Sequence, residues 1–252
     1  MHIKIKSVIC VTSILIKTNL AMDPITQTTS PIVTSSSTIG IVYKNGIMLA
    51  SDTLGSYGSM KKYKDVRRLF GLNSQTMLGG SGDLSDYQYI QDLLKMNALE
   101  KMCLGEGEDN AKEVWSFLRA KMYERRNKFD PLWNEVVVAG YDEEKVPFIG
   151  VVDKIGTAYG CNEKYIATGF GAYMALPYLR SEYRENMEEG EARALLEDCM
   201  RMLFYRDCRA GCRIQIGKVE MDGENGVVSE PYTLETSWDS PALMDLANDG
   251  GW

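Results

Sequence analysis

The sequence predicts an α+β fold, a four-layer sandwich with helices outside and two antiparallel sheets inside. The first observation is the order of the predicted elements: strands, two helices, strands, two helices and strands. The second is the incomplete alternation of apolar and polar residues within the strands, which is expected where helices cover one face of a sheet and a second sheet covers the other. No composition break divides the 252 residues, which favours one main domain.

The first two strands are predicted at 39–43 and 47–51, where short apolar runs flank the dipeptide Asn45-Gly46. Asn-Gly is the usual turn of a tight hairpin because both residues tolerate positive φ. The second strand delivers Asp52 at its exposed end. Residues 28–37, rich in Ser and Thr, predict an extended and weakly structured arm before this hairpin.

The later elements follow from apolar periodicity and turn residues. One helix begins after Ser81 or Asp83, either of which can cap it, and it ends before the break at 105–109. We expect the segments 157–159 and 165–167 to pair and to complete the second sheet. The other helices are predicted at 111–127 and 191–207, and the segment 167–180 begins a further helix. The other strands are predicted at 69–72, 76–78, 136–141, 148–152, 213–220 and 226–229.

Composition excludes several classes of function. The only histidine is His2, so Ser-His-Asp and Cys-His activation and histidine-bearing metal sites are absent from the rest of the chain. The net charge of -7 argues against nucleic-acid binding, which requires clustered cations. The six cysteines lack the spacing of a metal-binding motif. The Gly-x-Gly at Gly169 lacks the rest of a nucleotide-binding motif. No apolar run is long enough to span a membrane. We therefore expect no cofactor, metal, nucleic acid or membrane.

Five segments occur in the order ASDTLGSYGS, TMLGGSGD, DPLWNEVVVAGYD, ATGFGAYMALP and CMRMLFYRDCR. Together with the preceding hairpin they resemble the proteasome beta subunits, peptidase family T1, which have the N-terminal nucleophile hydrolase fold. The PLWN segment and the long arm before the first strand resemble the beta-7 class of that family. The resemblance implies a leader at 1–28, a proteasome beta-type domain at 29–236 and a C-terminal arm at 237–252.

The resemblance also implies where an active site would lie. Counting from Asp52 and Gly46 places the nucleophilic threonine position on Ser36 and the catalytic lysine position on Arg68. Gly79 and Gly80 match the glycine pair whose backbone amide forms the oxyanion pocket. The family's functional positions, most of them altered here, are Ser36, Asp52, Arg68, Phe170, Asp207 and Ala210.

These substitutions change the chemistry. A nucleophile of this type needs a free α-amine as its base, and nothing in the sequence frees an amine at Ser36. Arginine stays protonated at any accessible pH, so Arg68 cannot pass a proton as a lysine can, and it could instead form a structural salt bridge with Asp52. We interpret the site as non-catalytic.

The resemblance thus implies a structural subunit of the 20S proteasome beta ring, which acts in ubiquitin-dependent protein degradation in the cytoplasm and nucleus. The implied partners are neighbouring beta-6 and beta-1 subunits, the alpha ring and the opposite beta ring. The arm at 237–252 is expected to dock on beta-1 and beta-2 across the rings.

Two alternatives remain open. One is an active threonine- or serine-type endopeptidase subunit that uses Ser36, Thr34 or Thr29 after cleavage directly before that residue. The other is a secreted protein, because the charged and apolar residues at 4–16 imitate a signal peptide, although no clean cleavage site follows them.

Overall fold

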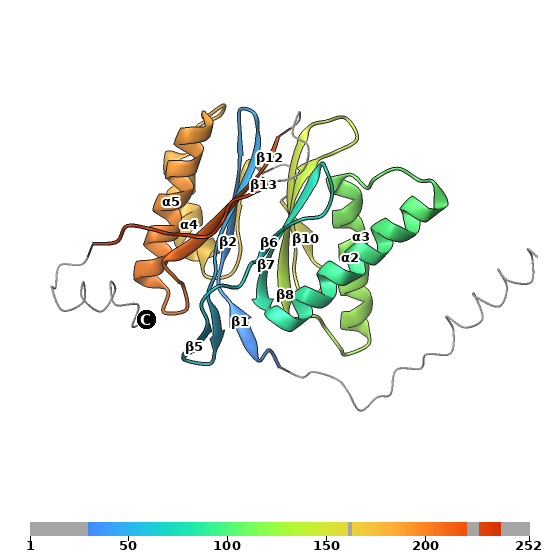
Figure 1. Ribbon diagram of the computed structural model, residues 1–252, viewed down its shortest axis with the longest axis horizontal. Coiled ribbons are helices and arrows are strands. Elements are labelled where there is room, and N and C mark those ends of the chain that lie inside the picture. The colour runs from blue at the N-terminus through green and yellow to red at the C-terminus, as the bar shows by residue number, and fades with distance from the viewer. Residues whose placement is uncertain (1–29, 161–162, 221–226, 238–252) are drawn as a thin grey trace, which may run out of the picture.

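The computed structural model describes residues 30–160, 163–220 and 227–237. The predicted leader, the candidate nucleophile Thr29 and most of the predicted C-terminal arm lie outside these residues. The described chain forms four layers (Figure 1): two helices, a six-stranded sheet, an eight-stranded sheet and two further helices. The predicted α+β sandwich is therefore confirmed.

The smaller sheet contains the predicted hairpin, in which Tyr43 lies opposite Gly46. Gly46 is required here because a Cβ atom would lie 2.1 Å from the carbonyl oxygen of Val219 on the neighbouring strand. The strand order is β11-β2-β3-β12-β13, with β14 paired to β12. Its strands are β2 (Thr38–Tyr43), β3 (Gly46–Asp52), β11 (Tyr165–Ala167), β12 (Arg213–Glu220), β13 (Val227–Val228) and β14 (Tyr232–Thr233).

The larger sheet has the order β10-β9-β8-β7-β1-β4-β5, with β6 paired to β7. Its strands are β1 (Val33–Ser35), β4 (Gly55–Tyr57), β5 (Met60–Tyr63), β6 (Leu69–Gly71), β7 (Thr76–Asp83), β8 (Asn134–Tyr141), β9 (Pro147–Val152) and β10 (Ala158–Tyr159).

The position of β1 corrects the prediction of a weakly structured arm. Thr34 lies opposite Ser56 of β4 on one side and Asp83 of β7 on the other. Two strands that are distant in sequence thus supply hydrogen-bond partners that the local Ser/Thr composition could not reveal. Directly after the hairpin, Gly55–Tyr57 forms strand β4, which pairs with β5.

The predicted pairing of 157–159 with 165–167 is wrong. β10 pairs with β9 in the larger sheet, whereas β11 pairs with β2 in the smaller sheet. The chain leaves the larger sheet at Gly160, whose φ of 94° lies in a region that favours glycine. Two adjacent short strands therefore belong to different layers.

The helices begin and end where capping residues allow. Asp83 caps α2, and Asn110 with Glu113 forms a capping box at α3. Gly105, with φ 76°, ends α2 in the left-handed conformation. The helices are α2 (Leu84–Leu104), α3 (Ala111–Asn127), α4 (Gly171–Glu182) and α5 (Glu189–Arg206). No helix among the described residues combines the length and apolar character needed to cross a membrane.

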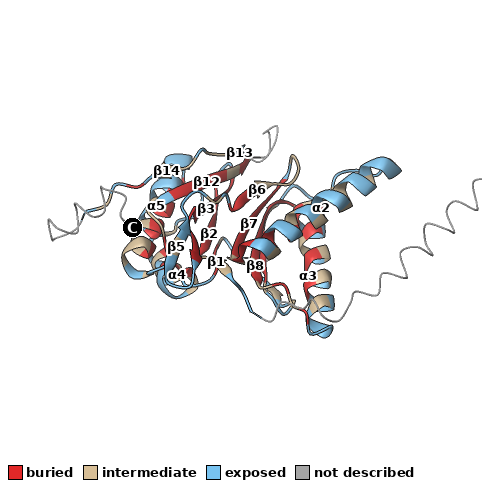
Figure 2. Cartoon of the chain, turned by 60° about the horizontal axis from the view of Figure 1, so that its bottom comes forward, coloured by how far each residue is buried: buried red, intermediate tan, exposed pale blue. Residues whose placement is uncertain are grey.

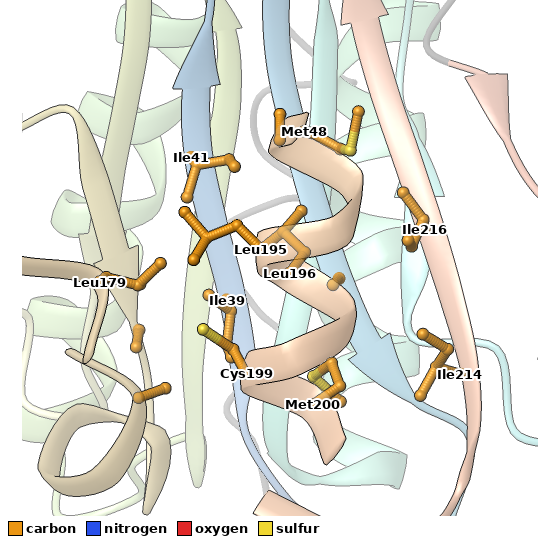
Figure 3. Close-up of a cluster of buried hydrophobic side chains, with 14 of the residues drawn as sticks. Ile39, Ile41, Met48, Leu179, Leu195, Leu196, Cys199, Met200, Ile214 and Ile216 are labelled. Carbon is orange, nitrogen blue, oxygen red and sulfur yellow. The ribbon is translucent and has the colours of Figure 1, made fainter. Parts of the chain in front are cut away.

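Three apolar clusters hold the layers together. One lies between α4, α5 and the smaller sheet, one lies between the two sheets, and one lies between the larger sheet and α2 and α3. Figure 2 shows the buried residues concentrated in the sheets and the exposed residues on the outer faces of the helices. In the first cluster α5 turns one apolar face onto the strands (Figure 3), with Leu195, Leu196, Cys199 and Met200 over Ile39, Ile41, Met48, Ile214 and Ile216.

Truncation of Leu196 tests this packing. Leu196 is 0% exposed, so Leu196→Ala should lower the free energy of unfolding by about 2–5 kcal/mol through lost burial and a residual cavity. The matched control is Leu99→Ala on α2, because Leu99 is 54% exposed and its truncation should change stability by less than about 0.5 kcal/mol. Urea unfolding of the two variants measures both values, and equal losses would contradict the packing described.

Candidate functional site

Arg68 lies just before β6, and its side chain is fully buried between the two sheets. Its guanidinium forms an ion pair with the Asp52 carboxylate. Every guanidinium nitrogen donates to a backbone carbonyl. The acceptors are the carbonyl oxygens of Asp52 at 2.9 Å, Ser36 at 2.9 Å, Gly80 at 3.1 Å and Ser37 at 3.1 Å.

Asp52, at the end of β3, is the acidic partner in this interior. One carboxylate oxygen pairs with Arg68, and the other accepts hydrogen bonds from the backbone amides of Gly211 at 2.9 Å and Leu54 at 3.4 Å. Burial raises the pKa of the Asp52 carboxyl, while the Arg68 guanidinium and the two amides act in the opposite direction. The ion pair that the sequence suggested between Asp52 and Arg68 is present, and both groups are engaged in the structure.

Ser36 lies in the link between β1 and β2. Its hydroxyl donates to the Asp207 carboxylate at 2.5 Å, and its carbonyl accepts from Arg68. Asp207 follows the last turn of α5, and its other oxygen accepts from the backbone amide of Arg209 at 2.9 Å. The fold thus brings Ser36, Arg68 and Asp52 into one network, with Asp207 at its edge.

The remaining two predicted positions carry no polar side-chain atom. Phe170 precedes α4, is 40% exposed and lies beside the ring of Tyr173. Ala210 is buried and packs in the apolar cluster of the smaller sheet. Neither position supplies the hydroxyl that a proton relay through them would need.

A cavity of about 530 Å³ opens beside these residues, and its wall includes Ser36, Gly82, Trp133, Phe170 and Asp207. The predicted oxyanion pair, Gly79 and Gly80, is placed differently. Gly79 lies within the ladders to β6 and β8, and the Gly80 amide donates to the carbonyl of Arg68 at 3.1 Å. From β7 the glycine that lines the cavity is Gly82, two residues further along the strand, with φ 102°, and Gly169 lines it from the segment before α4.

Strand β1 fills the slot between β4 and β7, directly before Ser36. The Ser35 hydroxyl donates to the carbonyl of Gly82 at 3.1 Å. The candidate nucleophile Thr34 lies inside this strand, where its hydroxyl oxygen accepts from Arg209 at 3.5 Å. The backbone before Ser36 is therefore a sheet strand with partners on both sides.

Sequence reasoning missed two hydroxyl groups that hold the site together. The buried Ser37 hydroxyl accepts from the amide of Gly171 at 2.7 Å and so links the start of α4 to the β1–β2 link. Thr168 accepts from the amide of Thr38 at 3.0 Å and from the Ser81 hydroxyl at 3.0 Å. The glycine-rich segment that follows Thr168 was the available signal, because it permits the close approach of α4 to Ser37.

Comparison with known protein families identifies the family of this chain. A family described as "Proteasome subunit" matches residues 32–219. The chain belongs to the proteasome subunit family. The resemblance inferred from the sequence motifs is thereby confirmed.

Curated relatives within the proteasome family carry beta-subunit names. Proteasome subunit beta type-4 of Xenopus laevis is 41% identical over 226 residues, which cover 88% of this chain and 90% of the relative. Proteasome subunit beta type-4 of Arabidopsis thaliana is 39% identical over 214 residues, with coverage of 84% and 85%. Proteasome subunit beta type-7 of Saccharomyces cerevisiae is 35% identical over 212 residues, with coverage of 80% and 79%.

Among the described residues of this proteasome subunit, no group of three or more His, Cys, Asp or Glu residues is placed to hold a metal ion. The Ser36 hydroxyl is bonded to Asp207, and Arg68 is paired with Asp52. The site is thus a network of protein groups in which a buried ion pair supports the backbone around Ser36.

Removing the Arg68 guanidinium tests whether the network supports the fold. Arg68→Met leaves the Asp52 carboxylate buried without its partner and should lower the free energy of unfolding by about 3–5 kcal/mol. The double variant with Asp52→Asn should recover part of that loss, because the unpaired charge is then absent. Urea unfolding gives both values.

The matched control is the neighbouring Arg67→Met. Arg67 forms an exposed ion pair with Glu230 at 2.6 Å, so its loss should cost less than about 1 kcal/mol. Similar losses for the two arginines, or strict additivity of the Asp52 and Arg68 substitutions, would contradict a coupled buried pair.

Proposed function

We propose that this chain is a non-catalytic structural subunit in the beta ring of the proteasome core particle. The observation that carries the proposal is the state of Arg68, which is buried with every nitrogen bonded to Asp52 or to a backbone carbonyl. A proton relay needs a group that can give up and regain a proton near neutral pH. Arginine does not do so, and here its hydrogen bonds fix it as a structural cation.

The surrounding groups support the same proposal. The hydroxyl at Ser36 is directed to Asp207, and in the uncleaved chain its backbone nitrogen is in the peptide bond that follows β1. Phe170 and Ala210 replace the hydroxyls of the active family pattern with apolar groups. Three positions of the active family pattern, Arg68, Phe170 and Ala210, are therefore unable to take part in a proton relay.

The role that we propose is geometric. A subunit of a closed ring presents different surfaces to its two neighbours and further surfaces to adjoining rings. We infer that this chain lies between beta-6 and beta-1 subunits, and that it also contacts the alpha ring and the opposite beta ring. Apolar side chains exposed on α2, among them Met96 and Met102, are suited to buried contacts in such an assembly. We propose the cytoplasm and nucleus as its location.

We further propose that the C-terminal arm docks on beta-1 and beta-2 across the rings. The described chain ends at Ser237 on the outer side of α5, where the Tyr205 hydroxyl bonds to both its amide and its carbonyl, at 2.8 and 3.0 Å. The sequence beyond it contains Trp238, Leu243 and Leu246 among acidic residues. Such apolar content in a terminal segment favours a docked position on a partner.

One observation favours the alternative of an active serine-type subunit. The short hydrogen bond from Ser36 to Asp207 holds a hydroxyl at the nucleophile position, beside an open cavity. That alternative requires the chain to be cleaved between Ser35 and Ser36, since only then does the α-amine become available as a base.

Replacing Ser36 within the assembled particle separates the two functions. The structural function predicts that Ser36→Ala leaves every peptidase activity of the core particle unchanged within error, because no reaction passes through this hydroxyl. Ser35→Ala is the matched control. Rates on fluorogenic peptides, together with N-terminal sequencing of the incorporated chain, provide the measurement. Loss of one activity, with a mature chain that starts at Ser36, would establish the catalytic alternative.

Deleting residues 237–252 tests the proposed arm. If the arm holds the two beta rings together, particles with the shortened chain should accumulate as half-particles, visible by native gel electrophoresis and sedimentation. Replacing the same residues with a Gly/Ser segment of equal length is the control for chain length and should fail in the same way. Normal yields of double-ring particles from the shortened chain would contradict the proposed role of the arm.

A further inference from the structure

Asp83 is the residue at which β7 ends and α2 begins, and its side chain is 4% exposed. One carboxylate oxygen accepts the amide hydrogens of Ser85 at 2.8 Å and Asp86 at 3.2 Å, which caps the helix. The other oxygen accepts the amide hydrogen of Ile32 at 2.8 Å, immediately before β1. The two oxygens of one buried side chain therefore serve two different segments.

The second bond takes the place of a missing rung in the sheet. On the β7 side, β1 pairs only through Thr34 with Asp83 and through Ser35 with Gly82. The next rung would need an extended residue after Asp83, but the chain has already turned into α2. The carboxylate supplies the acceptor that the backbone can no longer offer to Ile32.

Hydrogen bonds, more than apolar packing, hold this part of the chain. The residues of β1 are half-buried, and the Ile32 side chain is 58% exposed, so no large apolar side chain anchors the strand. Its position depends on backbone pairing with β4 and β7, on the side-chain bonds of Ser35 to Gly82 and of Arg209 to Thr34, and on the bond to Asp83. In such a short strand one bond to a charged acceptor is a large share of the total.

We propose that Asp83 is a positioning residue that latches residues 32–35 in the slot beside Ser36. The capping of α2 and the position of β1 are coupled, because the same carboxylate accepts hydrogen bonds from both segments. When the latch is open, β1 can leave the slot between β4 and β7, and the cavity next to Ser36 loses the wall that Thr34 and Ser35 provide. The inference concerns how the strand is held and does not depend on whether the subunit is catalytic.

Asp83→Asn separates the two roles in the full-length chain. Asparagine caps helices as well as aspartate does, so its oxygen can keep the bonds to Ser85 and Asp86. Its amide group then faces the Ile32 amide, and two donors cannot bond. Amide hydrogen exchange at residues 32–35 should accelerate by about tenfold or more, the effect of losing a hydrogen bond to a charged group, while exchange in the first turn of α2 stays unchanged. Unchanged exchange at residues 33–35 would overturn the proposal.

Asp86→Asn is the matched control. Asp86 lies in the same helical turn, and its carboxylate accepts from the amide of Trp133 at 2.9 Å, so its substitution should leave exchange at residues 32–35 unchanged. Faster exchange there in the control would also overturn the proposal, because the effect would then follow any change in the first turn of α2.

A second variant removes the donor in place of the acceptor. Ile32→Pro has no amide hydrogen at this position and should accelerate exchange at residues 33–35 as Asp83→Asn does. Since both substitutions break one bond, the double variant should exchange no faster than the more affected single variant. If the acceleration in the double variant equals the product of the two single accelerations, Asp83 acts on β1 only through the stability of α2. That result would refute the latch.

Discussion

The structure of this proteasome family member depends on one buried cation. The Arg68 guanidinium joins the end of β3, the link between β1 and β2, and the middle of β7, segments that are separated in sequence but adjacent in the interior. A charge in such a position costs several kcal/mol unless it is paired and fully hydrogen-bonded. Asp52 and four backbone carbonyls meet that requirement. The backbone around Ser36 is thereby bonded to the interior of the fold.

The buried network around Arg68 also connects β1 to the two sheets. Ser36 follows directly after β1, and its carbonyl accepts a hydrogen bond from Arg68. The position of β1 and that of the buried guanidinium are therefore linked through the backbone. At the other end of β1 the carboxylate of Asp83 holds Ile32 and starts α2. The segment in the slot is thus held near its two ends by buried polar residues, by Asp83 at Ile32 and by Arg68 at Ser36.

Much of the fold could be predicted because the signals were local. The Asn45-Gly46 turn, the capping residue Asp83 and the apolar periodicity of α3 and α5 each depend on neighbours within a few residues. Errors arose where a distant partner decided the outcome. Residues 33–35 form a strand only because β4 and β7 lie on both sides, and β10 and β11 enter different sheets because each finds its partner elsewhere. The β7 glycine that lines the cavity is Gly82, whereas the Gly80 amide is bonded to the carbonyl of Arg68.

The sequence by itself determined the class of fold, the family, and the chemical character of the residues at the site. An arginine cannot replace a lysine in proton transfer wherever it lies, and the side chains of Phe170 and Ala210 offer no hydroxyl in any conformation. Tertiary structure alone decided what those residues do. A buried polar group is costly unless it is hydrogen-bonded, and the partners found here come from segments that become neighbours only after the layers have packed. The pairing of Asp52 with Arg68, the seating of β1 and the double use of Asp83 arise from that requirement.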